Sequence, residues 1–187
     1  MIMLKRYILG LATLVMFFLM TPIASADKPH YTITTDATYA PFTFQDKNNR
    51  YVGIEQDMMK AIAEREGFTY TMKPMSFNSA AQLVSNGQAD GIIAGMSITP
   101  ERRQVYDFST PYYKTGVAWI VKKDSKIKSL ADLKGQTVAL KTGTAASEYG
   151  LSLQKKYGFQ VKYFNDTDTM YNCLLYTSPS PRDYAAS

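Results

Sequence analysis

Cysteine, histidine and tryptophan are nearly absent: the chain of 187 residues has one of each. A single cysteine, Cys173, cannot form a disulfide within the chain, and it excludes paired thiol chemistry. One histidine, His30, leaves no His/Cys set with metal-ligand spacing and no Ser-His-Asp arrangement. No Gly-rich loop of the Walker type occurs either. We therefore expect neither a metal ion nor a cofactor.

Long apolar runs are also lacking. The longest covers residues 7–20, which is shorter than the ~20 residues that span a bilayer. Lys5 and Arg6 precede this run, and Pro22 and the small residues Ala24-Ser25-Ala26 follow it, which is the layout of a secretory signal peptide. We expect residues 1–26 to be removed and the mature protein to be periplasmic.

Strong charge of one sign is missing. Between the two ends, residues 27–172 carry 18 basic and 15 acidic side chains. This mild excess excludes the basic surface of a nucleic-acid-binding protein. A hydrophobic content of 45% is ordinary for a globular protein and excludes a disordered chain.

The C-terminal end, residues 173–187, differs in style from the rest, because Pro and Ser alternate there without hydrophobic periodicity. Its first eleven residues resemble, one for one, the in-frame translation of a transposon-end sequencing adapter. We interpret 173–187 as a non-native tail and expect the natural protein to be cut off after about Asn172.

Between these ends, segments with strand and helix patterns alternate. Helical periodicity ending at a glycine is expected over residues 54–66 and 144–157, and a short helix capped by Asn78 is expected before Gly87. A further helix is expected to begin at residues 99–101, and a helical turn at 129–134. Short β-rich runs predict strands at residues 31–35, 68–72, 90–95, 115–121, 137–140 and 161–164. This alternation predicts open α/β sheets.

Five motifs make the family resemblance specific, and they cover residues 35–42, 51–57, 94–102, 107–113 and 141–144. They stand in the order and spacing of the polar amino-acid substrate-binding proteins of ABC importers, and the chain resembles the glutamine-binding members most closely. The resemblance implies a periplasmic-binding-protein-like α/β fold with two lobes joined by hinge strands. Lobe 1 would span residues 27–110, and 111–172 would be the hinge and part of lobe 2. The chain would thus be incomplete at its C-terminus.

The resemblance also implies a binding site for an α-amino acid. Arg102 can bind the α-carboxylate through a bidentate fork, whereas the neighbouring Arg103 is expected to be exposed. Ser97, the carbonyl of Gly95 and the helix N-terminus at Thr144 would add contacts. The acid that binds the α-ammonium in the family would lie beyond Asn172.

Four further residues would surround the ligand side chain. Tyr39 and Phe77 match the aromatic walls of the family's site, and Asp36 and Lys141 match positions that meet the end of the side chain. A neutral carboxamide can donate to an acid and accept from an ammonium, whereas a charged side chain is repelled by one of the two. This favours glutamine as the ligand.

The implied role is to capture a polar amino acid as a monomer and deliver it to the permease subunits of an ABC importer. Two alternatives stay open. Related folds include cyclic dehydratases, but an enzyme needs a general acid or base, for which only Asp36 and Lys141 are candidates. A ligand-sensing domain of a membrane receptor would carry its further domains downstream.

Overall fold

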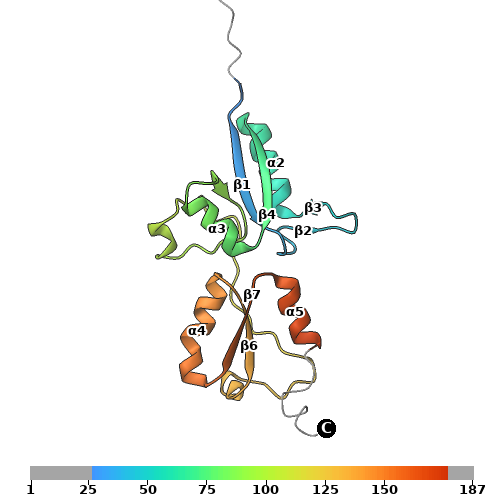
Figure 1. Ribbon diagram of the computed structural model, residues 1–187, viewed down its shortest axis with the longest axis vertical. Helices are drawn as coiled ribbons and strands as arrows, with labels where there is room; N and C mark the ends of the chain where they lie inside the picture. Colours follow the sequence, from blue (N-terminus) through green and yellow to red (C-terminus); the bar gives the residue numbers. More distant parts are fainter. Residues whose placement is uncertain (1–26, 177–187) are drawn as a thin grey trace, which may run out of the picture.

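The computed structural model describes residues 27–176, which form two α/β lobes, one above the other in Figure 1. Lobe 1 contains a parallel sheet of three strands in the order β4-β1-β5. Two short antiparallel strands, β2 and β3, form a hairpin beside it. The elements of lobe 1 are β1 (His30–Asp36), β2 (Phe44–Gln45), β3 (Tyr51–Val52), α2 (Ile54–Glu66), β4 (Thr69–Met75), α3 (Phe77–Ser85), β5 (Gly91–Ile92) and the 3₁₀ turn η1 (Arg102–Gln104).

Lobe 2 is smaller and is built around two parallel strands that pair over their whole length. Helices α4 and α5 flank these strands in Figure 1. Its elements are the 3₁₀ turn η2 (Leu130–Leu133), β6 (Thr137–Lys141), α4 (Ala145–Tyr157), β7 (Gln160–Phe164) and α5 (Thr167–Tyr176). The α/β class and the two-lobed fold expected from the sequence are confirmed.

Helices α2 and α4 end where the sequence predicts, because a glycine in the left-handed region follows each one. Gly67 has φ 74° and Gly158 has φ 68°, and each N–H bonds back to a carbonyl in the last turn of its helix. An L side chain is strained in this region, so glycine stops the helix at little cost. Thr144 caps α4, because its hydroxyl accepts a bond from the N–H of Ser147 at 3.1 Å.

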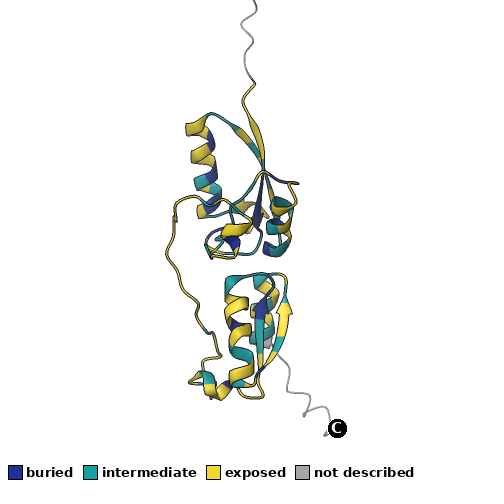
Figure 2. Cartoon of the chain, turned by 90° about the vertical axis from the view of Figure 1, so that its left-hand side faces the viewer, coloured by how far each residue is buried: buried dark blue, intermediate teal, exposed yellow. Residues whose placement is uncertain are grey.

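The link between the lobes departs from prediction. No helix or strand is assigned to residues 105–129, so the strand expected at 115–121, and with it a hinge strand, is absent. A strand needs a neighbour to bond with, and no strand of the described part pairs with this segment. Its apolar residues Val117, Ile120 and Val121 are exposed, and Figure 2 shows the link as a mostly exposed chain.

Three smaller predictions are corrected by local hydrogen bonds. Ser76, and not Asn78, caps α3, because its hydroxyl accepts from the N–H of Ser79. The strand expected at residues 90–95 is limited to β5, since only Gly91 and Ile92 pair with β1. The helix expected from residues 99–101 is the single 3₁₀ turn η1.

The two predicted end segments lie mostly outside the described residues. This holds for the signal peptide at 1–26 and for residues 177–187 of the tail. Helix α5 runs through Tyr176, so the predicted junction after Asn172 falls inside a helix, and the adapter origin of the tail stays a prediction. Among residues 27–176, no helix has the length and apolar character required to cross a membrane.

Candidate ligand-binding site

The candidate site residues cluster where strands and loops of the two lobes face each other. Asp36 is the last residue of β1, Phe77 begins α3 directly after β4, and Gly95 and Ser97 follow β5. From lobe 2, Lys141 is the last residue of β6, and Thr144 precedes α4. Ligands of open α/β sheets bind outside the carboxyl ends of the strands, so the fold itself brings these residues together.

Asp36 and Lys141 form an ion pair between the lobes. Lys141 Nζ lies 2.5 Å from Asp36 Oδ2, although 105 positions separate the two residues in the sequence. Both side chains are buried, with 4% of the Asp36 side chain and 9% of the Lys141 side chain exposed. Charges in such surroundings are weakly screened, so any side chain that enters here meets both signs at close range.

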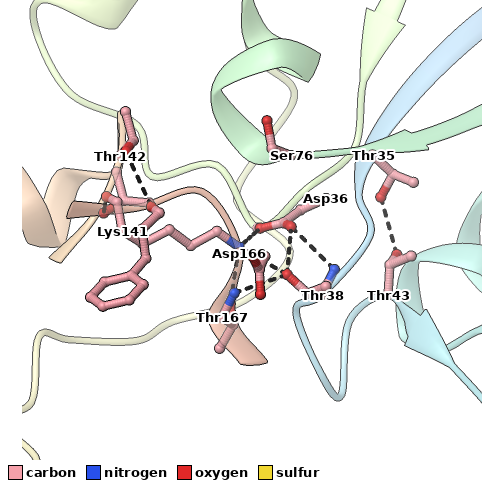
Figure 3. Close-up of polar contacts among 12 residues, drawn as sticks. Thr35, Asp36, Thr38, Thr43, Ser76, Lys141, Thr142, Asp166 and Thr167 are labelled. Carbon is pink, nitrogen blue, oxygen red and sulfur yellow. Dashed lines mark hydrogen bonds and ion pairs between the residues drawn. The ribbon is translucent and has the colours of Figure 1, made fainter. Parts of the chain in front are cut away.

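Two threonines extend this ion pair, and sequence reasoning missed both. Lys141 Nζ also donates to Thr167 Oγ1 at 2.9 Å, and the N–H of Thr167 donates to Thr38 Oγ1 at 3.0 Å. The N–H of Thr38 in turn donates to Asp36. Figure 3 shows these four residues meeting between the lobes. Thr38 lies inside one of the quoted motifs, whereas Thr167 lies in none, so only the fold reveals it.

Arg102 is buried, while its neighbour Arg103 is exposed, as expected. Nη1 of Arg102 donates to the carbonyl of Ser97 at 3.1 Å, and Nη2 donates to the carbonyl of Gly143 in lobe 2 at 3.0 Å. The guanidinium also lies 5.5 Å from the ring centroid of Phe77. Nη2 also lies 3.5 Å from Oε1 of Glu148. The guanidinium carries five N–H groups in a planar fork, so the donors that these contacts leave unused can bind a carboxylate.

Gly143 and Thr144 bring the N-terminus of α4 against lobe 1. Gly143 has φ 75°, where an L side chain is strained, and a Cβ atom there would lie 2.7 Å from Oδ1 of Asn78, so glycine favours this approach of the two lobes. Thr144 Oγ1 donates to the carbonyl of Lys141 at 3.0 Å, which ties the helix start to the end of β6. The first N–H groups of α4 therefore lie near Arg102 and Lys141.

Tyr39 and Gly95 pack against each other. A Cβ atom on Gly95 would lie 2.3 Å from Cε1 of Tyr39, and the backbone of Gly95 has φ 55°, so this position requires glycine. The Tyr39 ring stacks on Phe42 with centroids 5.0 Å apart. Burial raises the pKa of the Tyr39 hydroxyl, and the carboxylates of Glu55 and Asp36 raise it further. Tyr39 is thus a neutral aromatic surface beside the ion pair.

Glu55 is the second site feature that sequence reasoning missed. It is fully buried at the start of α2 and accepts hydrogen bonds from Tyr112, Gly95 and Thr43. Burial raises the pKa of this carboxyl above its usual value of 4.5, and the three hydrogen bonds offset that effect only in part. The residue lies within the motif at 51–57, but a sequence does not show that an acid is buried.

The raised pKa of Glu55 predicts a pH dependence of stability. Because the folded-state pKa lies above the unfolded value of 4.5, this group's contribution is fully present below pH 4.5 and is lost as pH rises through the folded pKa. Glu55→Gln removes that titration. Unfolding by urea at a series of pH values is expected to show the parent losing stability relative to Glu55→Gln as the pH increases. A difference that is constant with pH would contradict the assignment.

The described residues contain no group of three or more His, Cys, Asp or Glu side chains that could hold a metal ion. The polar groups gathered between the lobes instead suit a small zwitterion: a guanidinium fork, a helix N-terminus, aromatic surfaces and a buried acid–ammonium pair. Fold and site together show a two-lobed α/β architecture with polar groups gathered between the lobes.

The chain belongs to the bacterial extracellular solute-binding proteins, family 3, whose profile matches residues 31–174. It is 34% identical over 164 residues to the arginine-binding extracellular protein ArtP of Bacillus subtilis, which covers 84% of this chain and 64% of the relative. The chain thus spans somewhat less than two thirds of that relative's length.

Two solved structures are similar in both sequence and shape. An ancestral arginine-binding protein bound to arginine has a TM-score of 0.74 and 38% identity, covering 79% of this chain and 66% of that one. An ancestral arginine-binding protein bound to glutamine has a TM-score of 0.71 and 35% identity, covering 79% and 65%. A third similar structure, an ancestral amino-acid-binding protein described as a precursor of cyclohexadienyl dehydratase, has a TM-score of 0.72 and 33% identity, covering 78% and 65%.

Proposed function

We propose that the protein captures a polar amino acid between its two lobes outside the cytoplasm, as a monomer, and delivers it to the permease subunits of an ABC importer. The observation that carries this proposal is the meeting of Arg102, Lys141 and the start of α4 across the lobe boundary. A ligand held by groups from both lobes couples its binding to closure, which is the signal that an importer needs.

In this proposal, each group has one role. The free N–H donors of Arg102 and the N–H groups at Thr144 bind the α-carboxylate, and Ser97 and Gly95 contribute polar contacts from the loop after β5. Tyr39 and Phe77 form the walls around the aliphatic part of the ligand. Asp36 and Lys141 meet the end of its side chain.

Glutamine is the ligand that the ion pair favours. The Asp36 carboxylate can accept a bond from the amide nitrogen, and the Lys141 ammonium can donate to the amide oxygen. A cationic side chain would gain from Asp36 but would be repelled by Lys141 in weakly screened surroundings. Glutamate would have the opposite problem. Asparagine fits the same pattern one methylene short, so reach alone is expected to reject it by only ~10–200-fold.

Arginine is the second candidate, and the relatives favour it. ArtP is described as binding arginine, and ancestral arginine-binding proteins have been solved with arginine and with glutamine bound. Arginine would require Lys141 to leave Asp36, because the guanidinium and the ammonium would otherwise share one carboxylate. Glutamine therefore requires Lys141 to stay beside Asp36, whereas arginine requires Lys141 to move away.

A calorimetric titration with glutamine, asparagine, glutamate, arginine and histidine tests the proposal. It uses the mature protein in a form as long as its relatives, since this chain spans 64% of ArtP. Glutamine is expected to bind most tightly, with asparagine next. Tightest binding by arginine would overturn the glutamine assignment and leave the binding function intact, whereas binding of no amino acid would overturn both.

An enzyme or a receptor domain is less well supported. Among the residues near the site, Asp36 and Lys141 neutralise each other in one ion pair, so neither is free to act as general acid or base. The family match is to solute-binding proteins over residues 31–174. A dehydratase assay tests the enzyme, and the titration above tests amino-acid binding, so the two measurements distinguish these functions directly.

A further inference from the structure

Glu55 joins two parts of lobe 1 and the link between the lobes through one buried carboxylate. Its Oε1 accepts from the Tyr112 hydroxyl at 2.6 Å and from the N–H of Gly95 at 2.5 Å, and its Oε2 accepts from the Thr43 hydroxyl at 3.2 Å. The side chain is fully buried. All three partners donate, so the acceptor-only carboxylate satisfies every one of them.

Tyr112 belongs to the segment that links the lobes. This segment has no helix or strand between residues 105 and 129, and the Tyr112 residue as a whole is 42% exposed. Its hydroxyl nevertheless reaches the same oxygen that accepts the N–H of Gly95. The Tyr112 hydroxyl therefore holds the link against lobe 1. It does so through an oxygen of Glu55 that also accepts from Gly95, in the loop after β5.

Gly95 is the second donor to Oε1 of Glu55. It follows β5 in the loop that leads to Ser97, and its backbone packs against the Tyr39 ring. Ser97 in turn accepts a bond from Arg102. Gly95 thus lies between Glu55, the Tyr39 ring and the loop whose Ser97 carbonyl accepts from the guanidinium.

We infer that Glu55 is a positioning residue that couples the inter-lobe link, through Tyr112, to the ligand-binding loop at Gly95. The effect of this coupling on ligand binding rests on the proposed function. If the lobes close on an amino acid, movement of the link during closure alters the loop that holds this ligand. The bonds themselves are independent of which ligand binds. The Tyr112 hydroxyl helps to hold the Glu55 carboxylate in the position where it accepts the N–H of Gly95, so losing the hydroxyl loosens that position.

The test removes single hydroxyl groups. Tyr112→Phe deletes the donor from the link and leaves Glu55, Gly95 and the ring in place. Tyr113→Phe is the matched control: this neighbour is 58% exposed, and its ring contacts Phe42 edge-on. Amide hydrogen exchange of the full chain measures the Gly95 N–H directly, without any ligand. Exchange is expected to speed up about tenfold in Tyr112→Phe and to stay unchanged in Tyr113→Phe.

Ligand affinity supplies the second measurement. Tyr112→Phe is expected to weaken amino-acid binding about tenfold, within the usual range of coupling between sites. The double variant with Glu55→Gln is expected to bind no worse than the weaker single variant, because both changes break the same link. If Glu55→Gln does not fold, the comparison of Tyr112→Phe with Tyr113→Phe still tests whether Tyr112 is coupled to Gly95.

The outcomes separate the inference from the proposed function. Unchanged Gly95 exchange in Tyr112→Phe would overturn the coupling, even if that variant melted at a lower temperature. Faster exchange with unchanged affinity would also overturn it, since the link would then not reach the ligand. If the parent bound no amino acid, the proposed function would fail, and the exchange result would still show whether Glu55 connects the link to the loop.

Discussion

Replacing Arg102 with alanine is expected to weaken amino-acid binding about a hundredfold, which corresponds to about 3 kcal/mol. The guanidinium is buried, and its Nη atoms are held by carbonyls from both lobes. A buried, pre-oriented fork loses little entropy when a carboxylate binds, so its removal costs more than the loss of a surface charge. Calorimetry with glutamine measures the change.

Arg103 offers a control for this experiment. It is the next residue, it is exposed, and its guanidinium lies 5.9 Å from the centroid of the Phe108 ring. Arg103→Ala is expected to bind like the parent. Arg102→Lys, which keeps the charge and loses the fork, is expected to fall between the parent and Arg102→Ala. Equal binding by Arg102→Ala and the parent would refute the carboxylate assignment.

Lys141→Leu is expected to turn the site toward basic ligands. The change leaves Asp36 buried without its ammonium partner, and breaking a buried ion pair in this way costs about 3–5 kcal/mol of stability. A guanidinium or ammonium on the ligand would then replace the missing charge. We expect the ratio of arginine to glutamine affinity to rise about tenfold or more, because a charge-assisted bond is worth about 1.5–3 kcal/mol.

Lys155→Leu is the matched control, because Lys155 is an exposed lysine in the same lobe. It is expected to change neither stability nor preference. Thermal unfolding with and without arginine provides a second measurement, since a ligand that restores the missing charge should stabilise Lys141→Leu more than the parent. If the ligand preference does not move, Asp36 and Lys141 do not set the specificity.

Local signals determined which parts of the fold could be predicted. Helix α2 matches its prediction at both ends, because helical periodicity stops at Gly67. The turn η2 also matches, since Ser129 and Asp132 cap each other's backbone. Residues 115–121 failed for the opposite reason: a β-rich pattern describes a segment that can pair, and pairing depends on a partner that the segment itself does not contain.

The candidate site also contains residues that a local motif indicates and residues whose importance depends on the fold. Arg102 could be singled out from the motif around it, and the structure places it, buried, between carbonyls of the two lobes; its role toward a carboxylate stays a prediction. The direct bond between Asp36 and Lys141 could not be derived from spacing, since it joins two lobes across 105 positions. Glu55 and Thr167 went unnoticed, because their importance comes from burial and from neighbours brought close only by the fold.

The placement of site residues at strand ends, outside the sheet interiors, has an evolutionary consequence. The core of lobe 1 includes the side chains of Ile33, Ala63 and Ala80, while Asp36 and Lys141 terminate their strands. Substitutions at these termini change the polar groups between the lobes and leave the apolar core in place, so their cost in stability comes from the broken ion pair. If the protein binds an amino acid as proposed, a lineage can change that ligand by substitution at a few strand ends while the scaffold is inherited intact. Two ancestral arginine-binding proteins similar to this chain have been solved with arginine and with glutamine bound.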